Sequence, residues 1–196
     1  LHAERALRGN PRLGWASSAM LQLQSLGKDW TAAIETLRQQ AKSGLIPAAE
    51  SDRKQSALLT AQALEWEEQR PSEALESALR AHRLDASLVP AAVVAARLHI
   101  RNGAARKAAK VLRATWEKSP HPDIAEVMSH LKPGDTPEAR YERVQDLVRQ
   151  APASLEGDVA LARAAVAAQR WEAARKMLAP HLDGRPQARI CALMAD

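Results

Sequence analysis

Four alanines with similar neighbours recur along the chain, at Ala33, Ala74, Ala108 and Ala174. Ala74 and Ala108 are 34 positions apart, and Ala174 follows after 66 more, nearly twice that interval. In each case the residue four positions later is also apolar, which places the two on one face of a helix. A small residue there lets a second helix approach closely. The spacing therefore predicts a repeated helical unit of 34 residues, with one insertion around residues 42–51.

The composition favours helices and disfavours most other classes of structure. Alanine, the best helix former, makes up about a fifth of the 196 residues, and there are five Trp, one Tyr and no Phe. Hydrophobic residues account for 46%, too many for a disordered chain. The single cysteine, Cys191, excludes an internal disulfide framework. The longest apolar run, residues 88–96, is half the length of a membrane span. We therefore predict an all-α fold that does not cross a membrane.

The helical segments are expected to form about five antiparallel pairs, with further helices at the ends. The predicted pairs are 12–26 with 29–43, 51–69 with 72–83, 88–101 with 104–118, 123–131 with 137–150, and 155–168 with 171–181; the terminal helices cover 1–7 and 187–195. The fourth pair is irregular, because its first helix is short and its alanine position falls on or beside Arg140. The chain begins at Leu1 within a helical pattern, which we interpret as a fragment of a longer protein.

A 34-residue unit of two helices, with small residues at the helix crossing and proline at the boundary, resembles the tetratricopeptide repeat. Pro120 and Pro186 each follow an aligned alanine by twelve residues. The resemblance implies an α–α superhelix, with residues 1–196 as a single solenoid domain. Its concave surface would be lined by the first helix of each pair.

The tryptophans are predicted to serve two different purposes. Trp30 and Trp171 lie three positions before an aligned alanine, where a large side chain fills the gap beside a close helix crossing. We therefore expect both in the core of the repeat. Trp15 and Trp66 belong to first helices and are expected on the concave surface.

The register of the alanines assigns further residues to that concave surface. They are Ser18, Gln22, Leu59, Ala63, Val93, Arg97, Ile100, Arg101, Ala125, Ser129, Val159, Arg163 and Val166. Our predicted partner-binding residues are Trp15, Trp66, Arg97, Arg101 and Arg163, because a guanidinium group binds a carboxylate through two hydrogen bonds. The alternative is that these arginines are ordinary solvated side chains.

The sequence offers no recognisable chemistry for catalysis. Neither a phosphate-binding nor a dinucleotide-binding glycine motif occurs, and the HExxH and GxSxG motifs are absent. No two of the six histidines have the i, i+4 spacing that would present both to one metal ion. The net charge of +5 comes from dispersed arginines rather than a basic stripe, which argues against nucleic-acid binding. We expect a non-enzymatic protein with no catalytic residue, metal or cofactor.

Several stretches are also similar to the soluble domain of the proteobacterial HemY family. They are residues 11–16, 58–61, 88–92, 119–125, 131–135, 155–157 and 191–195, in the same order along nearly the whole chain. This resemblance implies an inner-membrane protein with an anchor upstream of this soluble part, associated with late haem biosynthesis. Its partners would be other proteins, with the enzymes of terminal haem synthesis as candidates.

Two other functions remain open from the sequence. One is a generic tetratricopeptide adaptor in envelope assembly. The other is a haem or porphyrin carrier that uses one histidine, His99 or His82.

Overall fold

A computed structural model describes residues 13–182 and 187–195 of the chain. This part contains eleven α-helices, one short 3-10 helix and no strand, which confirms the all-α prediction. The predicted helix over 1–7 lies outside the described residues. The chain divides into two units, Leu1–Ala95 and Ala96–Asp196, and the division falls inside helix α6 (Val89–Arg101).

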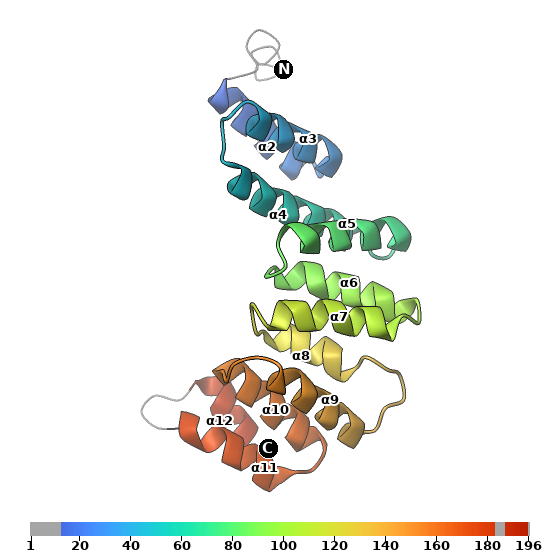
Figure 1. Cartoon of the computed structure of the whole chain (residues 1–196), viewed down its shortest axis with the longest axis vertical. Coiled ribbons are helices and arrows are strands. Elements are labelled where there is room, and N and C mark those ends of the chain that lie inside the picture. Colours follow the sequence, from blue (N-terminus) through green and yellow to red (C-terminus); the bar gives the residue numbers. More distant parts are fainter. Residues whose placement is uncertain (1–12, 183–186, 196) are drawn as a thin grey trace. The chain divides into compact units, whose positions relative to one another are not determined.

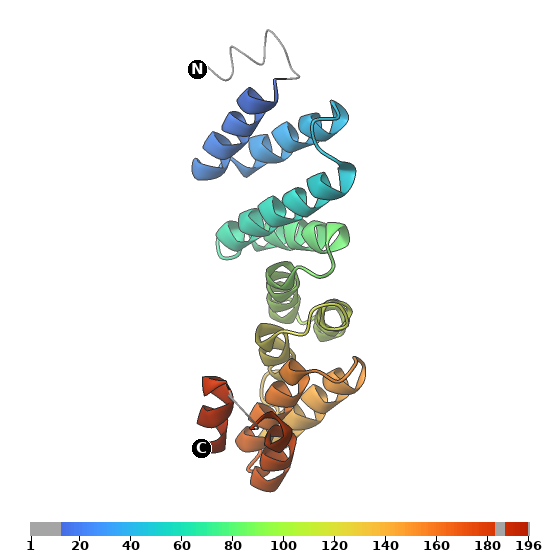
Figure 2. The same ribbon diagram turned by 90° about the vertical axis from the view of Figure 1, so that its left-hand side faces the viewer.

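The first unit consists of two helix pairs and the beginning of α6. Helix α2 (Gly14–Leu26) pairs with α3 (Trp30–Lys42), and α4 (Ala48–Trp66) pairs with α5 (Pro71–Leu84). Short loops join the members of each pair, which lie side by side in Figures 1 and 2. Helix α3 also packs against α4. The two pairs thus stack in sequence order, as in a tetratricopeptide-like repeat.

The second unit continues the pattern. It contains α7 (Ala105–Trp116), α8 (Pro122–Ser129), α9 (Pro137–Arg149), α10 (Leu155–Ala167), α11 (Trp171–Leu178), the 3-10 helix η1 (Ala179–His181) and α12 (Ala188–Ala195). Helix α8 pairs with α9, and α10 pairs with α11. Helix α10 packs against α8 and α9 of the preceding pair, and α12 covers α10 and α11.

Local sequence explains where these helices begin. Asp29, Thr136 and Ser154 each accept a hydrogen bond from a backbone N–H in the first turn of the following helix. Pro71, Pro122 and Pro137 occupy first positions of helices, where a missing N–H costs nothing. Such signals lie within a few residues of the boundary they define, and the predicted helix ends accordingly agree with the structure to within about three residues.

The aligned alanines lie where the spacing predicts. Ala33, Ala74 and Ala108 are fully buried, and Ala174 is nearly so. Each is the fourth residue of the second helix of its pair, in α3, α5, α7 and α11 respectively. The 34-residue period therefore marks equivalent positions in equivalent helices.

Three expectations about the core and the loops are wrong. Trp171, the first residue of α11, was expected in the core but is 46% exposed. The insertion lies mainly in helix rather than loop, since α4 has 19 residues where the other first helices described have 13 or 8. The helix predicted to reach residue 181 ends at Leu178 and continues as η1, because Pro180 has no N–H to extend the α-helical ladder.

Trp30 is half-buried and links the α2–α3 pair to α4 of the next pair. Its indole Nε1 donates a hydrogen bond to Glu65 Oε2 on α4 over 2.5 Å, and Lys28 Nζ lies 3.3 Å from Glu65 Oε1. These contacts, the Trp30 hydrogen bond above all, lower the pKa of Glu65.

Candidate functional site

One helix pair departs from the repeat at the position that sets the distance between its helices. The fourth residue of α9 is Arg140, whereas the equivalent residue of α3, α5, α7 and α11 is alanine. An arginine side chain is far larger than a close crossing tolerates, and Arg140 is half-buried where the four aligned alanines are buried. The irregularity seen in the sequence therefore corresponds to a different side-chain environment at this position.

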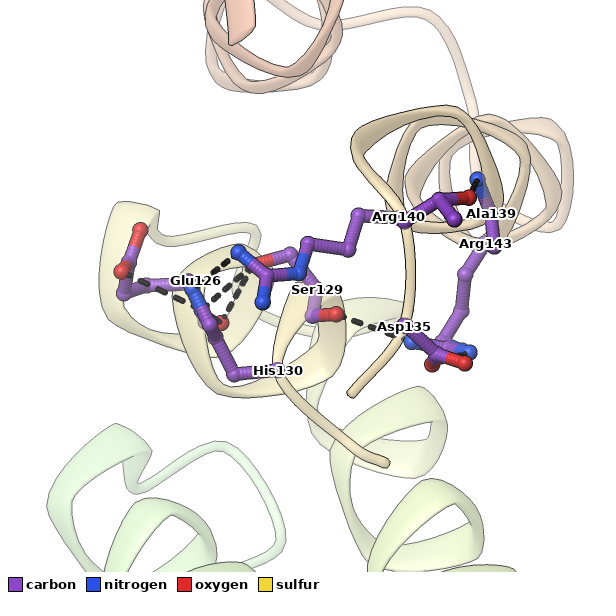
Figure 3. A network of polar contacts seen from close by, with 8 residues as sticks. Glu126, Ser129, His130, Asp135, Ala139, Arg140 and Arg143 are labelled. Carbon is purple, nitrogen blue, oxygen red and sulfur yellow. Dashed lines mark hydrogen bonds and ion pairs between the residues drawn. The ribbon is translucent and has the colours of Figure 1, made fainter. Parts of the chain in front are cut away.

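Figure 3 shows how the Arg140 side chain is accommodated. It extends from α9 toward the C-terminal end of α8, where its Nη1 donates a hydrogen bond to His130 Nε2 over 3.1 Å. Arg140 Nε is buried and has no hydrogen-bond partner among the residues that the structure describes.

The contacts of His130 define its tautomer. Because Nε2 accepts a hydrogen bond from Arg140, the ring proton must be on Nδ1 in the neutral form. Nδ1 lies 2.8 Å from Ser129 Oγ and 3.1 Å from the backbone oxygen of Glu126. Either oxygen can accept a hydrogen bond from the Nδ1–H group. The imidazole of His130 supplies no negative charge to compensate Arg140.

A second arginine of α9 ties the connecting loop to the helix. Arg143 forms an ion pair with Asp135, and its Nη1 donates a hydrogen bond to the backbone oxygen of Ser129 over 2.8 Å (Figure 3). Both charged side chains are largely shielded from solvent, with 15% and 20% of their surface exposed. These contacts tie the loop residue Asp135 and the end of α8 to α9.

A pocket of about 160 Å³ lies among α8, α9 and α10. Its apolar lining is formed by Pro122, Ala125, Val144, Val159, Ala160, Ala164 and Ala167, and its polar lining by Glu126, Ser129, His130, Arg140, Glu156 and Arg163. The alanines of α10 keep the pocket open, because larger side chains at those positions would fill it. We refer to this site as the α8–α10 pocket.

The charges around the α8–α10 pocket are unequally compensated. Glu156 accepts two hydrogen bonds from Arg189 of α12, over 2.8 and 2.5 Å. The bonds from Arg189 are the main reason that the pKa of Glu156 is lowered, and they also raise the pKa of Arg189. Arg163 is exposed and forms no ion pair within the described part of the chain. Glu126 Oε1 lies 3.4 Å from His130 Nδ1. The lining thus contains two arginines and two glutamates, and one of these glutamates, Glu156, is already paired with Arg189.

Four of the five predicted concave residues of the last two pairs line this pocket: Ala125 and Ser129 of α8, and Val159 and Arg163 of α10. The fifth, Val166, does not belong to the lining. Sequence reasoning missed His130 and Arg140 as lining residues. The available signal was the arginine at an alanine position, which indicated irregular packing but not what the side chain would contact.

The other predicted binding residues lie elsewhere. Trp15 is 63% exposed on α2, and Trp66 is half-buried at the end of α4 with Arg70 Cζ 5.3 Å from the centre of its ring. Arg97 and Arg101 belong to α6 and have polar contacts of their own. Leu59 and Ala63, assigned to the concave surface, are instead buried, because α4 is covered by both α3 and α5.

The two histidines considered for haem binding are not part of the pocket. His99 is 7% exposed on α6, and burial, followed by the charge of Lys107, lowers its pKa. His82 lies near the end of α5 and has a polar contact. Among residues 13–182 and 187–195, no group of three or more His, Cys, Asp or Glu side chains is arranged to hold a metal ion. In the same residues, no helix combines the length and the apolar character needed to cross a membrane.

Comparison with known proteins gives limited similarity. No protein-family profile matches the chain. A probable magnetosome protein, Mms48, of Magnetospirillum gryphiswaldense is 27% identical over 168 residues, which cover 86% of this chain. The matched region is only 37% of that protein, so the chain spans little more than a third of the length of this relative.

Two solved structures are similar in part. The crystal structure of the MamA protein superposes with a TM-score of 0.45 and 12% identity, covering 89% of this chain and 98% of that one. A thermophilic TPR protein of Thermus thermophilus gives a TM-score of 0.38 and 19% identity, covering 84% of this chain and 87% of that one. None of these similarities assigns the chain to a family.

Proposed function

We propose that this chain is a non-enzymatic scaffold that binds other proteins through its helix pairs. The observation that carries the proposal is the α8–α10 pocket, a mainly apolar hollow whose lining includes Arg163, an exposed side chain with no ion pair among the described residues. Its volume of about 160 Å³ is below the roughly 300–1,000 Å³ of typical small-molecule sites. A space of this size suits a side chain presented by another protein better than a substrate or a porphyrin.

Trp15, Trp66, Arg97 and Arg101 are proposed as additional partner contacts. An exposed indole and dispersed guanidinium groups are typical of residues that contribute strongly to protein interfaces. Reversing two of the charges together, Arg97→Glu with Arg101→Glu, is expected to weaken partner capture without loss of helicity. Unchanged capture would remove these arginines from the interface.

For the biological setting we propose a HemY-like protein held at the bacterial inner membrane by a segment outside this chain. The support is the ordered resemblance described from the sequence, and its partners would then include enzymes of terminal haem synthesis. A second candidate is a role in magnetosomes, because the 27% identity to Mms48 extends over 86% of the chain. Both candidates use the same scaffold and differ in the partner.

Site-specific photo-crosslinking of the full-length protein in its own cells tests the scaffold proposal. A photoreactive residue in place of Ala167, an exposed member of the pocket lining, should capture a partner protein. The same residue in place of Glu172, exposed on α11 and outside the lining, is the matched control. Absence of any specific adduct at Ala167 and at the other proposed contacts would refute the proposal.

The identity of the adduct distinguishes the two settings. An enzyme of terminal haem synthesis supports the HemY-like proposal, whereas a magnetosome protein supports the second candidate. The carrier alternative is tested separately by titrating haem into the purified protein. A saturable Soret shift that is lost in His99→Ala or His82→Ala would favour the carrier and contradict a scaffold without cofactor.

A further inference from the structure

We propose that the α8–α10 pocket binds one medium-sized apolar side chain of a partner segment that has an aspartate or glutamate beside it. This inference rests on the proposed scaffold function and specifies the chemistry of the partner. It follows from the size of the pocket, its lining and the charges at its rim.

The volume limits the occupant to a single side chain. A buried apolar cavity of about 150 Å³ in another protein is known to accommodate benzene, and the α8–α10 pocket offers about 160 Å³. Leu, Ile, Met or Phe would fit such a space, whereas two adjacent large residues would not. Because the lining is mostly alanine, valine and proline, transfer of an apolar side chain into the pocket releases water from apolar surface.

The charge expected of the partner's flanking residue follows from which charged groups of the pocket already have a partner within this chain. Glu156 is neutralised by Arg189, which belongs to α12 and lies outside the lining. Arg140 contacts His130 through a neutral nitrogen, and Arg163 has no ion pair among the described residues. The rim therefore has positive charge on α9 and α10, opposed only by Glu126 on α8.

A carboxylate beside the inserted side chain would complement this arrangement. It could accept hydrogen bonds from the Arg163 guanidinium and reduce the unfavourable charge of Arg140. A basic neighbour would instead face two arginines. A neutral segment would gain only the apolar contact, and its binding should then be insensitive to the charge of residue 163.

Arg140 is the residue that makes this site specific to one helix pair. Alanine at the equivalent position of α3, α5, α7 and α11 is buried, whereas Arg140 lines the α8–α10 pocket and adds a positive charge to it. The residue that breaks the alanine pattern thus supplies part of the electrostatic preference of the site.

Selection from a display library of random heptapeptides on the full chain tests the inference. Enriched sequences should combine one of Leu, Ile, Met or Phe with a neighbouring Asp or Glu. A selected peptide is then synthesised together with a version in which Asn or Gln replaces its acid. We expect the neutral version to bind about tenfold more weakly, with the difference shrinking at high salt.

Variants of the protein assign the binding to the pocket. Ala160→Leu should fill the space and abolish measurable binding of the selected peptide. Arg163→Glu should weaken it about tenfold or more, because attraction becomes repulsion, while Arg163→Lys should retain most of it. Arg106→Glu, an exposed charge reversal on α7 away from the pocket, is the matched control and should bind normally.

Binding that persists unchanged in both Ala160→Leu and Arg163→Glu would overturn the inference, and so would selection of peptides without an acidic residue. Since Arg163 is exposed, its reversal keeps the test informative even if Ala160→Leu fails to fold. If a partner is still crosslinked in cells to the same extent in these variants, the pocket inference is wrong, whereas the scaffold proposal is unaffected. Conversely, peptide binding without any cellular adduct would contradict the scaffold proposal alone.

Discussion

Replacing Ala74 by leucine tests whether the alanine period marks close helix crossings. Ala74 is fully buried in α5, and the other buried residues of that helix are also small: Ser77, Ala78 and Ala81. The fully buried positions of α5, which packs against α4, thus hold only small side chains. A leucine at residue 74 must displace α4 or adopt a strained rotamer.

The sign of the effect distinguishes a tight crossing from a loose one. If space were available, the three added carbons would stabilise the fold by about 0.8 kcal/mol each. At a tight crossing the same change is expected to cost about 1–3 kcal/mol. For a chain of this length that cost corresponds to a decrease in Tm of roughly 2–12 °C.

Thermal unfolding followed by far-UV circular dichroism measures this change. Glu76→Leu adds a similar apolar side chain at an exposed site of the same helix and should alter stability by no more than about 0.5 kcal/mol. A Tm for Ala74→Leu equal to or above that of the control would refute the close-packing explanation of the 34-residue period.

Three further substitutions test individual contacts in the second unit. Gly157→Val should lower the free energy of unfolding, measured in urea, by about 1–3 kcal/mol, because even a Cβ at that position would lie 3.1 Å from Val148 Cγ1. Unchanged stability would show that the Val148 side chain moves away without cost. Asp135→Asn should lower the free energy of unfolding by about 1.5–3 kcal/mol, because it removes the charged acceptor of Arg143. A decrease below about 0.5 kcal/mol, as for an ordinary surface substitution, would contradict that role. The lowered pKa of His99 means that the unfolded chain takes up a proton there more readily than the folded one. Stability should therefore fall as the pH decreases through about 6.5, and His99→Gln should reduce this dependence relative to the wild type over pH 7.5 to 5.5; identical slopes would exclude His99 as a source.

The candidate site could be predicted from sequence only in part. Ala125, Ser129, Val159 and Arg163 follow from helical periodicity, because each has a fixed place relative to an aligned alanine. The contact between Arg140 and His130 does not follow, since it depends on the path of the loop between α8 and α9. The volume of the α8–α10 pocket depends on how three helices pack together, which the periodicity of one helix does not predict.

Long-range pairs show the same limit. Arg189 and Glu156 are 33 residues apart, and nothing in their local sequence indicates that α12 returns to α10. Yet this pair decides that Glu156 contributes little negative charge to the pocket. The sign of the charge at the rim is thus a property of tertiary structure, although every charged residue is visible in the sequence.

Sequence alone determined the all-α class, the helix pairs and the positions of the buried alanines, because helix periodicity and capping act over four residues or fewer. Tertiary structure decided that Trp171 is exposed. It also decided that Arg140 contacts His130 and lines a pocket among three helices. These outcomes depend on which side chains from distant segments occupy the same space, and that is settled only when the helices pack.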